Sequence, residues 1–259
     1  MNNEKFRNFV LTSQRYLAPV LVASCGLAGC SPPRVEIKNT PVKTPGPART
    51  PAARVDKPVN ISFSTFSTDW PVGWEWIDPD EKREPTPHDV KTGVLRIRVP
   101  PNKDLYGANR NAPRYMKVVT GDFQIETRVK FYPVENHQGA GLLIYEDGDN
   151  YLRLERAYGG HGGGGSAIRF DLRKPGSYEP LVAPGEIMTD APRVELKIIR
   201  SGNVFSGFWR DNENAEWREV GEFASDYPET LQIGLFACNT AEEVTAEFAY
   251  IRLLPYINN

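Results

Sequence analysis

Apolar and polar residues alternate with a period of two in nearly every segment between residues 60 and 255. In residues 123–131 (FQIETRVKF), the odd positions are mainly apolar and the even positions are polar. Because successive side chains of a β-strand point to opposite faces, this alternation predicts a strand with one buried face. The segments around Ile97 and Leu196 repeat the pattern. A period of two does not suit amphipathic helices, so we expect an all-β domain.

Turn sequences rich in Gly, Asn and Asp separate these segments, of which there are about fourteen. They lie at residues 120–122, 147–150, 201–203 and 211–214. Many short strands with regular turns predict a two-sheet antiparallel β-sandwich over residues 59–255, and a closed barrel is the alternative. The sequence shows no repeat of fixed period, which a propeller would require.

The first 29 residues have the layout of an export signal. Lys5, Arg7 and Arg15 precede an uncharged stretch, residues 16–29, that is shorter than the roughly 20 apolar residues needed to span a bilayer. The stretch ends in LAGC, residues 27–30, which resembles the lipobox of bacterial lipoproteins. This resemblance implies that residues 1–29 are removed and that Cys30 is acylated. An ordinary secretory signal is the alternative.

Residues 31–58 have a composition that cannot build a core. They include seven prolines and no aromatic residue, which predicts an extended tether over residues 30–58. Ser31 occupies the position where some bacteria place an Asp for inner-membrane retention. The lipoprotein resemblance therefore implies a lipid-anchored protein of the cell envelope, held at the outer membrane with its domain in the periplasm or at the cell surface.

Charge and cysteine usage exclude several classes of function. The formal net charge is −2, and residues 1–29 hold three basic side chains and one acidic one, so the remainder carries −4. Nucleic-acid binding needs a basic stripe, so we expect none. The glycine-rich run 159–165 lacks the Lys and Ser/Thr of a phosphate loop, which argues against a nucleotide. Cys238 is the only cysteine after Cys30, and we expect it to be buried in a strand over residues 231–238.

A succession of short motifs resembles a known family. The motifs are WEW (74–76), NAP (111–113), GDF (121–123), GAGLLIY (139–145), DGDNY (147–151) and GLFA (234–237). Together they resemble the concanavalin A-like domains of the DUF1349 type, and they are similar to the C-terminal β-sandwich of many family 43 glycoside hydrolases. The resemblance implies a jelly-roll sandwich with one concave sheet. It implies no activity, because such domains mostly occur as accessory modules or uncharacterised proteins.

The hairpin around residues 148 and 149 allows its two faces to be assigned. If these residues form the turn, Asp147 faces Asn150, Tyr145 faces Leu152 and Leu143 faces Leu154. The core face then carries Leu143, Tyr145, Leu152 and Leu154. The opposite face, near Ile144 and Leu142, carries Glu146, Tyr151, Arg153 and Glu155.

That opposite face offers the groups that a sugar site uses. Tyr151 provides a ring for the apolar face of a sugar, and Arg153, Glu146 and Glu155 provide charged partners for hydroxyl groups. Trp76 is a further candidate for stacking. The alternatives are an ordinary solvated sheet face and, for Trp76 with its neighbour Trp74, a plug at the end of the core.

Asp147, Asp149 and Asn150 are weak candidates for a metal site. Their oxygens suit Ca²⁺, but this ion takes six to eight ligands and one hairpin supplies too few. Local hydrogen bonds within the turn explain the same residues. We therefore expect no cofactor and keep a structural calcium ion as the alternative.

Catalytic motifs are absent from the sequence. It has no Glu-x-Asp-x-x-Glu strand, no Gly-x-Ser-x-Gly elbow and no His-Glu-x-x-His motif. We expect a non-catalytic carbohydrate-binding protein that contacts the membrane through its lipid and binds a polysaccharide or an envelope protein. One alternative is a structural or protein-interaction lipoprotein. The other is a glycoside hydrolase or lyase whose carboxylates converge from distant strands.

Overall fold

The computed structural model describes residues 62–64, 66, 72–107, 109–159, 165–183 and 185–256. All of them belong to the compact unit Val55–Asn259. The predicted signal, the predicted lipidation site Cys30 and the predicted tether lie outside the described residues, and so do residues 160–164 of the glycine-rich run. In the described part of the chain, no helix is long and apolar enough to span a membrane.

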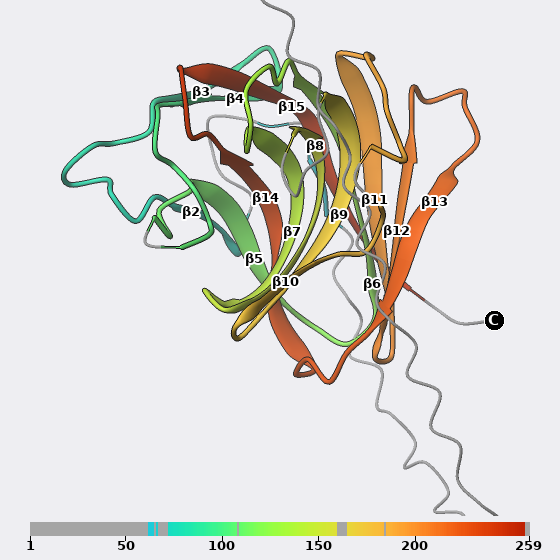
Figure 1. The fold of residues 1–259 in the computed structure, drawn as a ribbon. Coiled ribbons are helices and arrows are strands. Elements are labelled where there is room, and N and C mark those ends of the chain that lie inside the picture. Colours follow the sequence, from blue (N-terminus) through green and yellow to red (C-terminus); the bar gives the residue numbers. More distant parts are fainter. Residues whose placement is uncertain are drawn as a thin grey trace, which may run out of the picture. The chain divides into compact units, whose positions relative to one another are not determined.

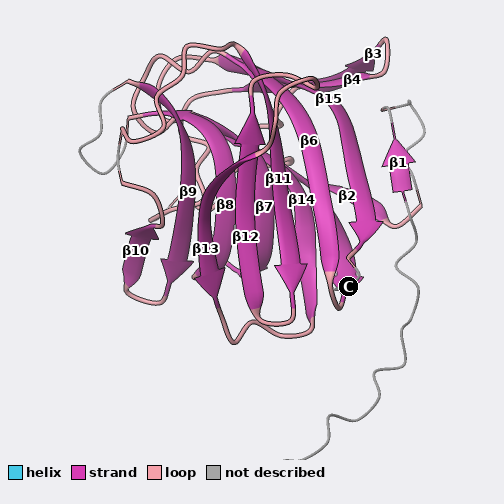
Figure 2. Ribbon diagram, turned by 90° about the vertical axis from the view of Figure 1, so that its right-hand side faces the viewer, coloured by secondary structure: helices cyan, strands magenta, loops and turns pink. Residues whose placement is uncertain are grey.

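Strands in two antiparallel sheets make up the described domain (Figures 1 and 2). Sheet A contains, in spatial order, β13 (Arg218–Ala224), β12 (Val204–Arg210), β11 (Arg193–Ser201), β6 (Phe123–Phe131), β15 (Val244–Pro255), β4 (Val94–Val99) and β3 (His88–Lys91), with β1 (Ser62–Ser64) also paired to β15. Sheet B contains β10 (Ser177–Pro180), β9 (Ser166–Lys174), β8 (Asn150–Tyr158), β7 (Gly139–Asp147), β14 (Thr230–Cys238), β5 (Arg114–Thr120) and β2 (Trp74–Ile77). Over the residues that the structure describes, the predicted two-sheet sandwich is confirmed, and neither sheet closes into the alternative barrel.

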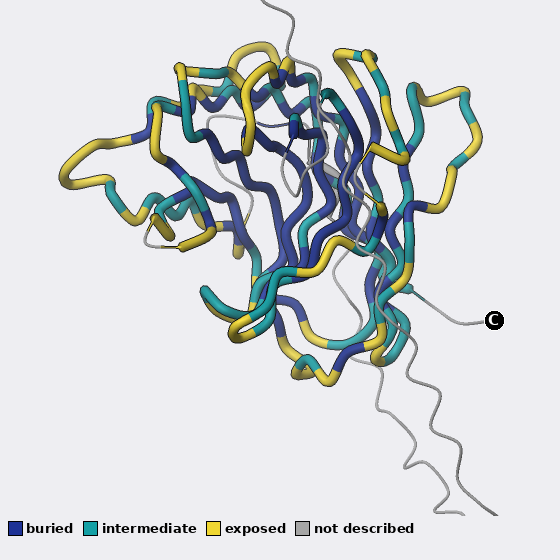
Figure 3. Tube along the Cα trace, in the orientation of Figure 1, coloured by how far each residue is buried: buried dark blue, intermediate teal, exposed yellow. Residues whose placement is uncertain are grey.

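The main core lies between the sheets. In β6 the alternation has the predicted direction, since Phe123, Ile125, Val129 and Phe131 are fully buried. Figure 3 shows the same distribution for the domain, with burial along the strands and exposure in the connections. Each fully buried large side chain of this kind contributes about 1.5–3 kcal/mol through the hydrophobic effect. The period of two in the sequence therefore reflects the two-layer packing directly.

A second, smaller core covers part of the outer face of sheet B. The connection between β4 and β5 folds back over this face, and Leu105 and Ala112 pack there against the sheet. The sheet residues beneath them are Met116, Leu143, Tyr151, Phe236 and Cys238. Cys238 is buried at the end of β14, as predicted, and burial raises the pKa of its thiol well above the ordinary value. Sheet B is thus covered on both faces at β5, β14 and β7.

The register of the β7–β8 hairpin differs from the prediction because β7 contains a bulge. Asp147 faces Asn150 as expected, but Tyr145 then faces Tyr151, and Ile144 faces Leu152. Glu146 is the extra residue, and a bulge of this kind shifts every later pair by one position. Leu142 and Ile144 therefore join Leu152 and Leu154 in the main core. Leu143 and Tyr145, which we expected in that core, lie on the outer face instead.

Candidate functional site

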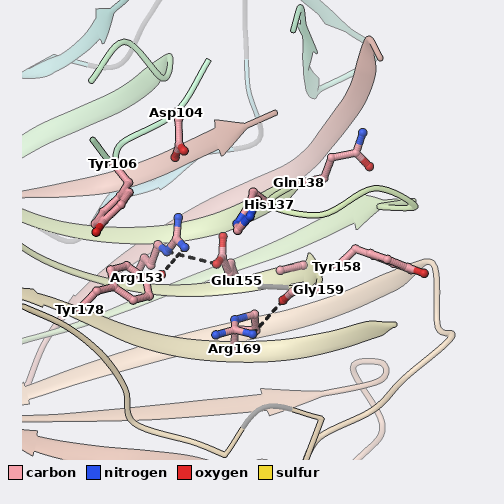
Figure 4. A pocket seen from close by; sticks show the side chains of 11 residues that line it. Asp104, Tyr106, His137, Gln138, Arg153, Glu155, Tyr158, Gly159, Arg169 and Tyr178 are labelled. Atoms are coloured by element: carbon pink, nitrogen blue, oxygen red, sulfur yellow. Dashed lines mark hydrogen bonds and ion pairs between the residues drawn. The ribbon is translucent and has the colours of Figure 1, made fainter. Parts of the chain in front are cut away.

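A pocket of about 370 Å³ opens on the part of sheet B that the second core leaves uncovered. Figure 4 shows its lining side chains from close by, with Asp104 and Tyr106 on one side and Arg169 on the other. Its lining residues are Asp104, Tyr106, His137, Gln138, Arg153, Glu155, Ala157, Tyr158, Gly159, Arg169 and Tyr178. The volume lies within the range of about 300–1,000 Å³ that is usual for small-molecule sites.

Strand alternation brings the charged residues of the floor together. Arg153 and Glu155 come from β8, and their cross-strand partners on β9 are Asp171 and Arg169. Because alternate residues share a face, these four side chains form a square of opposite charges on the outer side of the sheet. Tyr178 reaches the same square from β10, at the edge of sheet B.

Asp171 is the centre of a hydrogen-bond network on this floor. Arg169 donates to both of its carboxylate oxygens, at 3.0 Å from Nε and 3.2 Å from Nη2. The Tyr178 hydroxyl donates to Asp171 at 2.7 Å and accepts a hydrogen bond from Arg153. Burial raises the pKa of Tyr178 well above its ordinary value, so this hydroxyl keeps its proton. The network fixes both guanidinium groups in place.

Glu155 is held on one side only. Its Oε1 lies 3.1 Å from Arg153 Nε, whereas its Oε2 has no hydrogen-bond partner among the described residues and is shielded from solvent. Gly139 makes room for this carboxylate, because a Cβ at position 139 would overlap it. Burial raises the pKa of Glu155 to about 7, although the charge of Arg153 opposes the shift. A buried acceptor without a partner has an energetic cost that a ligand donor would remove.

The first loop around the pocket carries Asp104 and Tyr106. Lys103 anchors this loop, because its fully buried ammonium group donates to the Glu84 carbonyl at 2.8 Å and lies 3.5 Å from Asp78 Oδ1. The Tyr106 ring is about half exposed and meets the Tyr178 ring edge to face, with 5.7 Å between the centroids. A partly exposed aromatic ring at the mouth of a polar pocket suits the apolar face of a sugar.

The second loop contributes His137, between β6 and β7. His137 has a φ of 68°, a left-handed conformation that is uncommon outside glycine. Its backbone amide donates to the Tyr158 carbonyl at 3.1 Å, which holds the loop against the end of β8. In Figure 4 the imidazole lies beside the Glu155 carboxylate, on the side away from Arg169. Backbone strain of this type is concentrated at functional sites in proteins.

Two of the five predicted ligand-binding residues, Arg153 and Glu155, meet in this pocket. Tyr151 shares their face of β8, but it is fully buried beneath the first loop, where its hydroxyl donates to the Leu105 carbonyl at 3.3 Å. It is therefore unavailable as a stacking platform, contrary to the prediction. Glu146 is exposed in the β7 bulge and does not line the pocket.

Trp76 lies elsewhere in the domain. It belongs to β2, the edge strand of sheet B opposite β10, and its ring stacks on His88 at 4.0 Å between centroids. Trp74 is buried and stacks on Tyr115. Both tryptophans pack against the main core, so they close its end, as the alternative interpretation predicted.

The three candidate metal ligands, which lie in the β7–β8 hairpin, already have protein partners. Asp147 accepts hydrogen bonds from the Asp149 amide at 2.7 Å and from the Asn150 side chain. Asp149 pairs with Arg110 at 2.7 Å and with Arg173 at 3.2 Å. Two guanidinium groups disfavour a cation at this place, and the described residues contain no group of three or more His, Cys, Asp or Glu side chains suited to a metal ion. The bonds inside the turn agree with the alternative explanation.

Most of the residues that line the pocket were not predicted from the sequence. Arg169 and Asp171 follow the same alternation as Arg153 and Glu155, so the pattern in residues 166–174 was a usable signal. No comparable signal exists for Asp104, Tyr106 or His137, because loops without regular periodicity bring them to the pocket.

The comparisons with known proteins agree with this architecture. Residues 63–253 match the family described as the beta xylosidase C-terminal concanavalin A-like domain. Among solved structures, a xylan beta-1,4-xylosidase from Bacillus halodurans is similar with a TM-score of 0.62 and 18% identity, over 77% of this chain and 40% of that chain. The GH43 protein BlXynB from Bacillus licheniformis is similar with a TM-score of 0.60 and 18% identity, over 75% of this chain and 39% of that chain.

A plant lectin shares the fold over its whole length. The seed lectin of Lotus tetragonolobus has a TM-score of 0.51 and 11% identity, over 77% of this chain and 99% of that chain. The comparison with curated proteins found no match. The chain spans about two fifths of the length of the two Bacillus proteins, and at these identities the likeness shows the fold alone. The family match covers most of the chain, which therefore belongs to the beta xylosidase C-terminal concanavalin A-like domain family.

Proposed function

We propose that the chain is a non-catalytic carbohydrate-binding protein and that the pocket on sheet B holds its sugar. The unpartnered Oε2 of Glu155 carries this proposal, because it is a buried acceptor on a side chain that lines the pocket. A sugar hydroxyl is a donor of the right kind for it. Tyr106 and Tyr158 add ring surface at the rim, and the lectin fold supports the same class of ligand.

We further propose that the protein is held at the cell envelope through a lipid on Cys30. The LAGC sequence at residues 27–30 and the proline-rich segment that follows support this proposal. The tether would let the pocket reach a polysaccharide at a distance from the membrane. Metabolic labelling with a radioactive fatty acid tests the anchor, because Cys30→Ser should abolish the incorporation of label.

A glycoside hydrolase is the second candidate, and one observation favours it. Asp104 and Glu155 are two carboxyl groups at one pocket, and a pKa of about 7 at Glu155 suits a general acid. Binding is supported better, because the Glu155 carboxylate is fixed by Arg153 and packed against Gly139. The release of reducing sugar from glycans that bind would establish the hydrolase instead.

A glycan array with a soluble form that begins at Val55 tests the binding proposal. We expect selective signals that Arg153→Glu removes, since this change reverses a charge at the centre of the floor. Arg218→Glu is the matched control, because Arg218 forms an exposed ion pair on β13 of sheet A. No binding above background in the unmodified protein would overturn the proposal. Crosslinked protein partners that are lost in Arg153→Glu would point to the protein-interaction alternative.

A further inference from the structure

We propose that the pocket selects sugar units that carry no carboxylate and that it rejects uronic acids. The inference rests on the proposed function and names the class of sugar. It follows from which charges at the pocket are already paired and which remain available to a ligand. The groups that decide it are Asp104, Glu155, Arg153, Arg169 and Asp171.

Both arginines of the floor are committed to protein partners. Arg169 makes its two-fold contact with Asp171 and also donates to the Gly159 carbonyl at 2.8 Å. Arg153 contacts Glu155 and the Tyr178 hydroxyl, and its Nη2 lies 3.6 Å from Asp171. Recognition of a carboxylate by arginine uses two parallel N–H groups of one guanidinium. Arg153 and Arg169 already direct such groups at Asp171 and Glu155.

In contrast to the arginines, the acidic groups Glu155 and Asp104 remain available to a ligand. Glu155 is 1% exposed, and its Oε2 lacks a hydrogen-bond partner among the described residues. Asp104 lines the opposite side of the pocket, and its side chain accepts a hydrogen bond from the Leu105 amide at 2.6 Å through one oxygen. Above about pH 7, where Glu155 is ionised, the lining carboxylates Asp104 and Glu155 together with the buried Asp171 beneath them outnumber the two arginines, so this cluster then carries one excess negative charge.

This excess of negative charge discriminates between two sugars that differ only in carrying a hydroxymethyl group or a carboxylate at the same position. A hydroxymethyl group can donate a hydrogen bond to Glu155 or Asp104, whereas a carboxylate in the same place meets two acceptors of its own charge. Juxtaposed like charges are a strong basis for rejecting a wrong ligand. We expect at least a roughly tenfold preference for the uncharged sugar at low ionic strength, where screening is weak.

Matched polysaccharides test the inference. The probes are uronate-containing polysaccharides and the same polymers after chemical reduction of their carboxylates to primary alcohols, together with neutral glycans. Binding is measured by affinity electrophoresis and titration calorimetry on the soluble form that begins at Val55, at pH 8, above the pKa of about 7 of Glu155. We expect reduction to strengthen binding. Asp104→Asn and Glu155→Gln should each reduce the ratio of the two affinities, for the reduced and for the unreduced polymer, by at least about threefold, because each variant removes one negative charge.

Glu213→Gln is the control, since it removes an exposed carboxylate that pairs with Arg128 on sheet A. It should leave the preference unchanged. Equal or stronger binding of the unreduced polymers would overturn the inference while the proposed function stands, and so would a preference that neither pocket variant alters. If no glycan binds in either form, the proposed function fails, and the inference that rests on it fails too.

Discussion

Arg153 and Glu155 form a buried ion pair on one face of β8, with 3.1 Å between Nε and Oε1 and side-chain exposures of 11% and 2%. Removing one partner of a buried pair leaves an uncompensated charge, at a typical cost of about 3–5 kcal/mol. Arg153 also lies beside Asp171, so Arg153→Met would leave two carboxylates without its charge. We expect this variant to lose about 3 kcal/mol of unfolding free energy, as measured by urea denaturation.

A double-mutant cycle checks that the pair causes the loss. In Arg153→Met with Glu155→Gln, the loss should be smaller than the sum of the two single losses, because each single change strands the other residue. Arg83→Met, at an exposed ion pair with Asp80, should cost less than about 1 kcal/mol. Additive losses at 153 and 155 would show that the two residues act independently.

Glu155 should also make stability depend on pH. Burial raises its pKa from 4.5 to about 7, so the folded protein binds this proton more tightly than the unfolded chain does. The resulting stabilisation is complete below about pH 4.5 and is lost as the pH rises through 7. One proton gives a slope of at most about 1.4 kcal/mol per pH unit. The charged and titratable groups around the carboxyl are Arg153, Arg169, Asp171, Asp104, Cys238, Tyr178 and the His137 imidazole.

The measurement compares the unfolding free energy of the wild type and of Glu155→Gln at several pH values from 4.5 to 8. The difference between the two proteins isolates Glu155 from the other titrating groups. Relative to this variant, the wild type should become less stable as the pH rises through that window. A constant difference across the window would show that the folded state does not shift this pKa.

The alternation in the sequence was sufficient to predict the sandwich, because burial between two sheets imposes a period of two on every strand. It was also sufficient to place Arg153 and Glu155 on one face, with Leu152 and Leu154 in the core. Which residues of one strand share a face depends only on their spacing in that strand, not on the register with its neighbours. The prediction for the faces of β8 is therefore correct although the prediction for its partner β7 was wrong.

The parts that could not be predicted depend on single irregular residues and on loops. Nothing in the local pattern marks Glu146 as a bulge, and this one residue reverses the faces of Leu143 and Ile144. Nor does the pattern reveal that the β4–β5 connection covers Tyr151 with Leu105. Such coverage depends on tertiary contacts between residues far apart in the chain, here Lys103 with Asp78 and with the backbone of Asn239.

Gly139 should be intolerant of even one added methyl group. A Cβ there would overlap the Glu155 carboxylate and lie 3.3 Å from Cys238 Sγ. Overpacking of a tight site costs about 1–3 kcal/mol, so Gly139→Ala should lower the unfolding free energy by this amount. It should also weaken any glycan binding, because Glu155 must move. The loss caused by Gly139→Ala should be smaller in a Glu155→Ala background than in the wild type, and equal losses in the two backgrounds would refute the proposed overlap.

Lys103 should be essential for the position of the first pocket loop. Its side chain is fully buried between Asp78 and the Glu84 carbonyl, and its backbone pairs with that of Asn239, so it ties two loops to the end of β14. Lys103→Met keeps most of the apolar stem but strands the buried carboxylate of Asp78. We expect a loss of about 3–5 kcal/mol, together with faster hydrogen exchange at the amides of Asn111 and Ala112, which bond to the Asp104 carbonyl. Lys174→Met, at an exposed pair with Glu179, should change neither quantity appreciably. Unchanged exchange at residues 111 and 112 in the Lys103 variant would mean that other contacts hold the loop, because a loop released from its anchor cannot keep these hydrogen bonds protected.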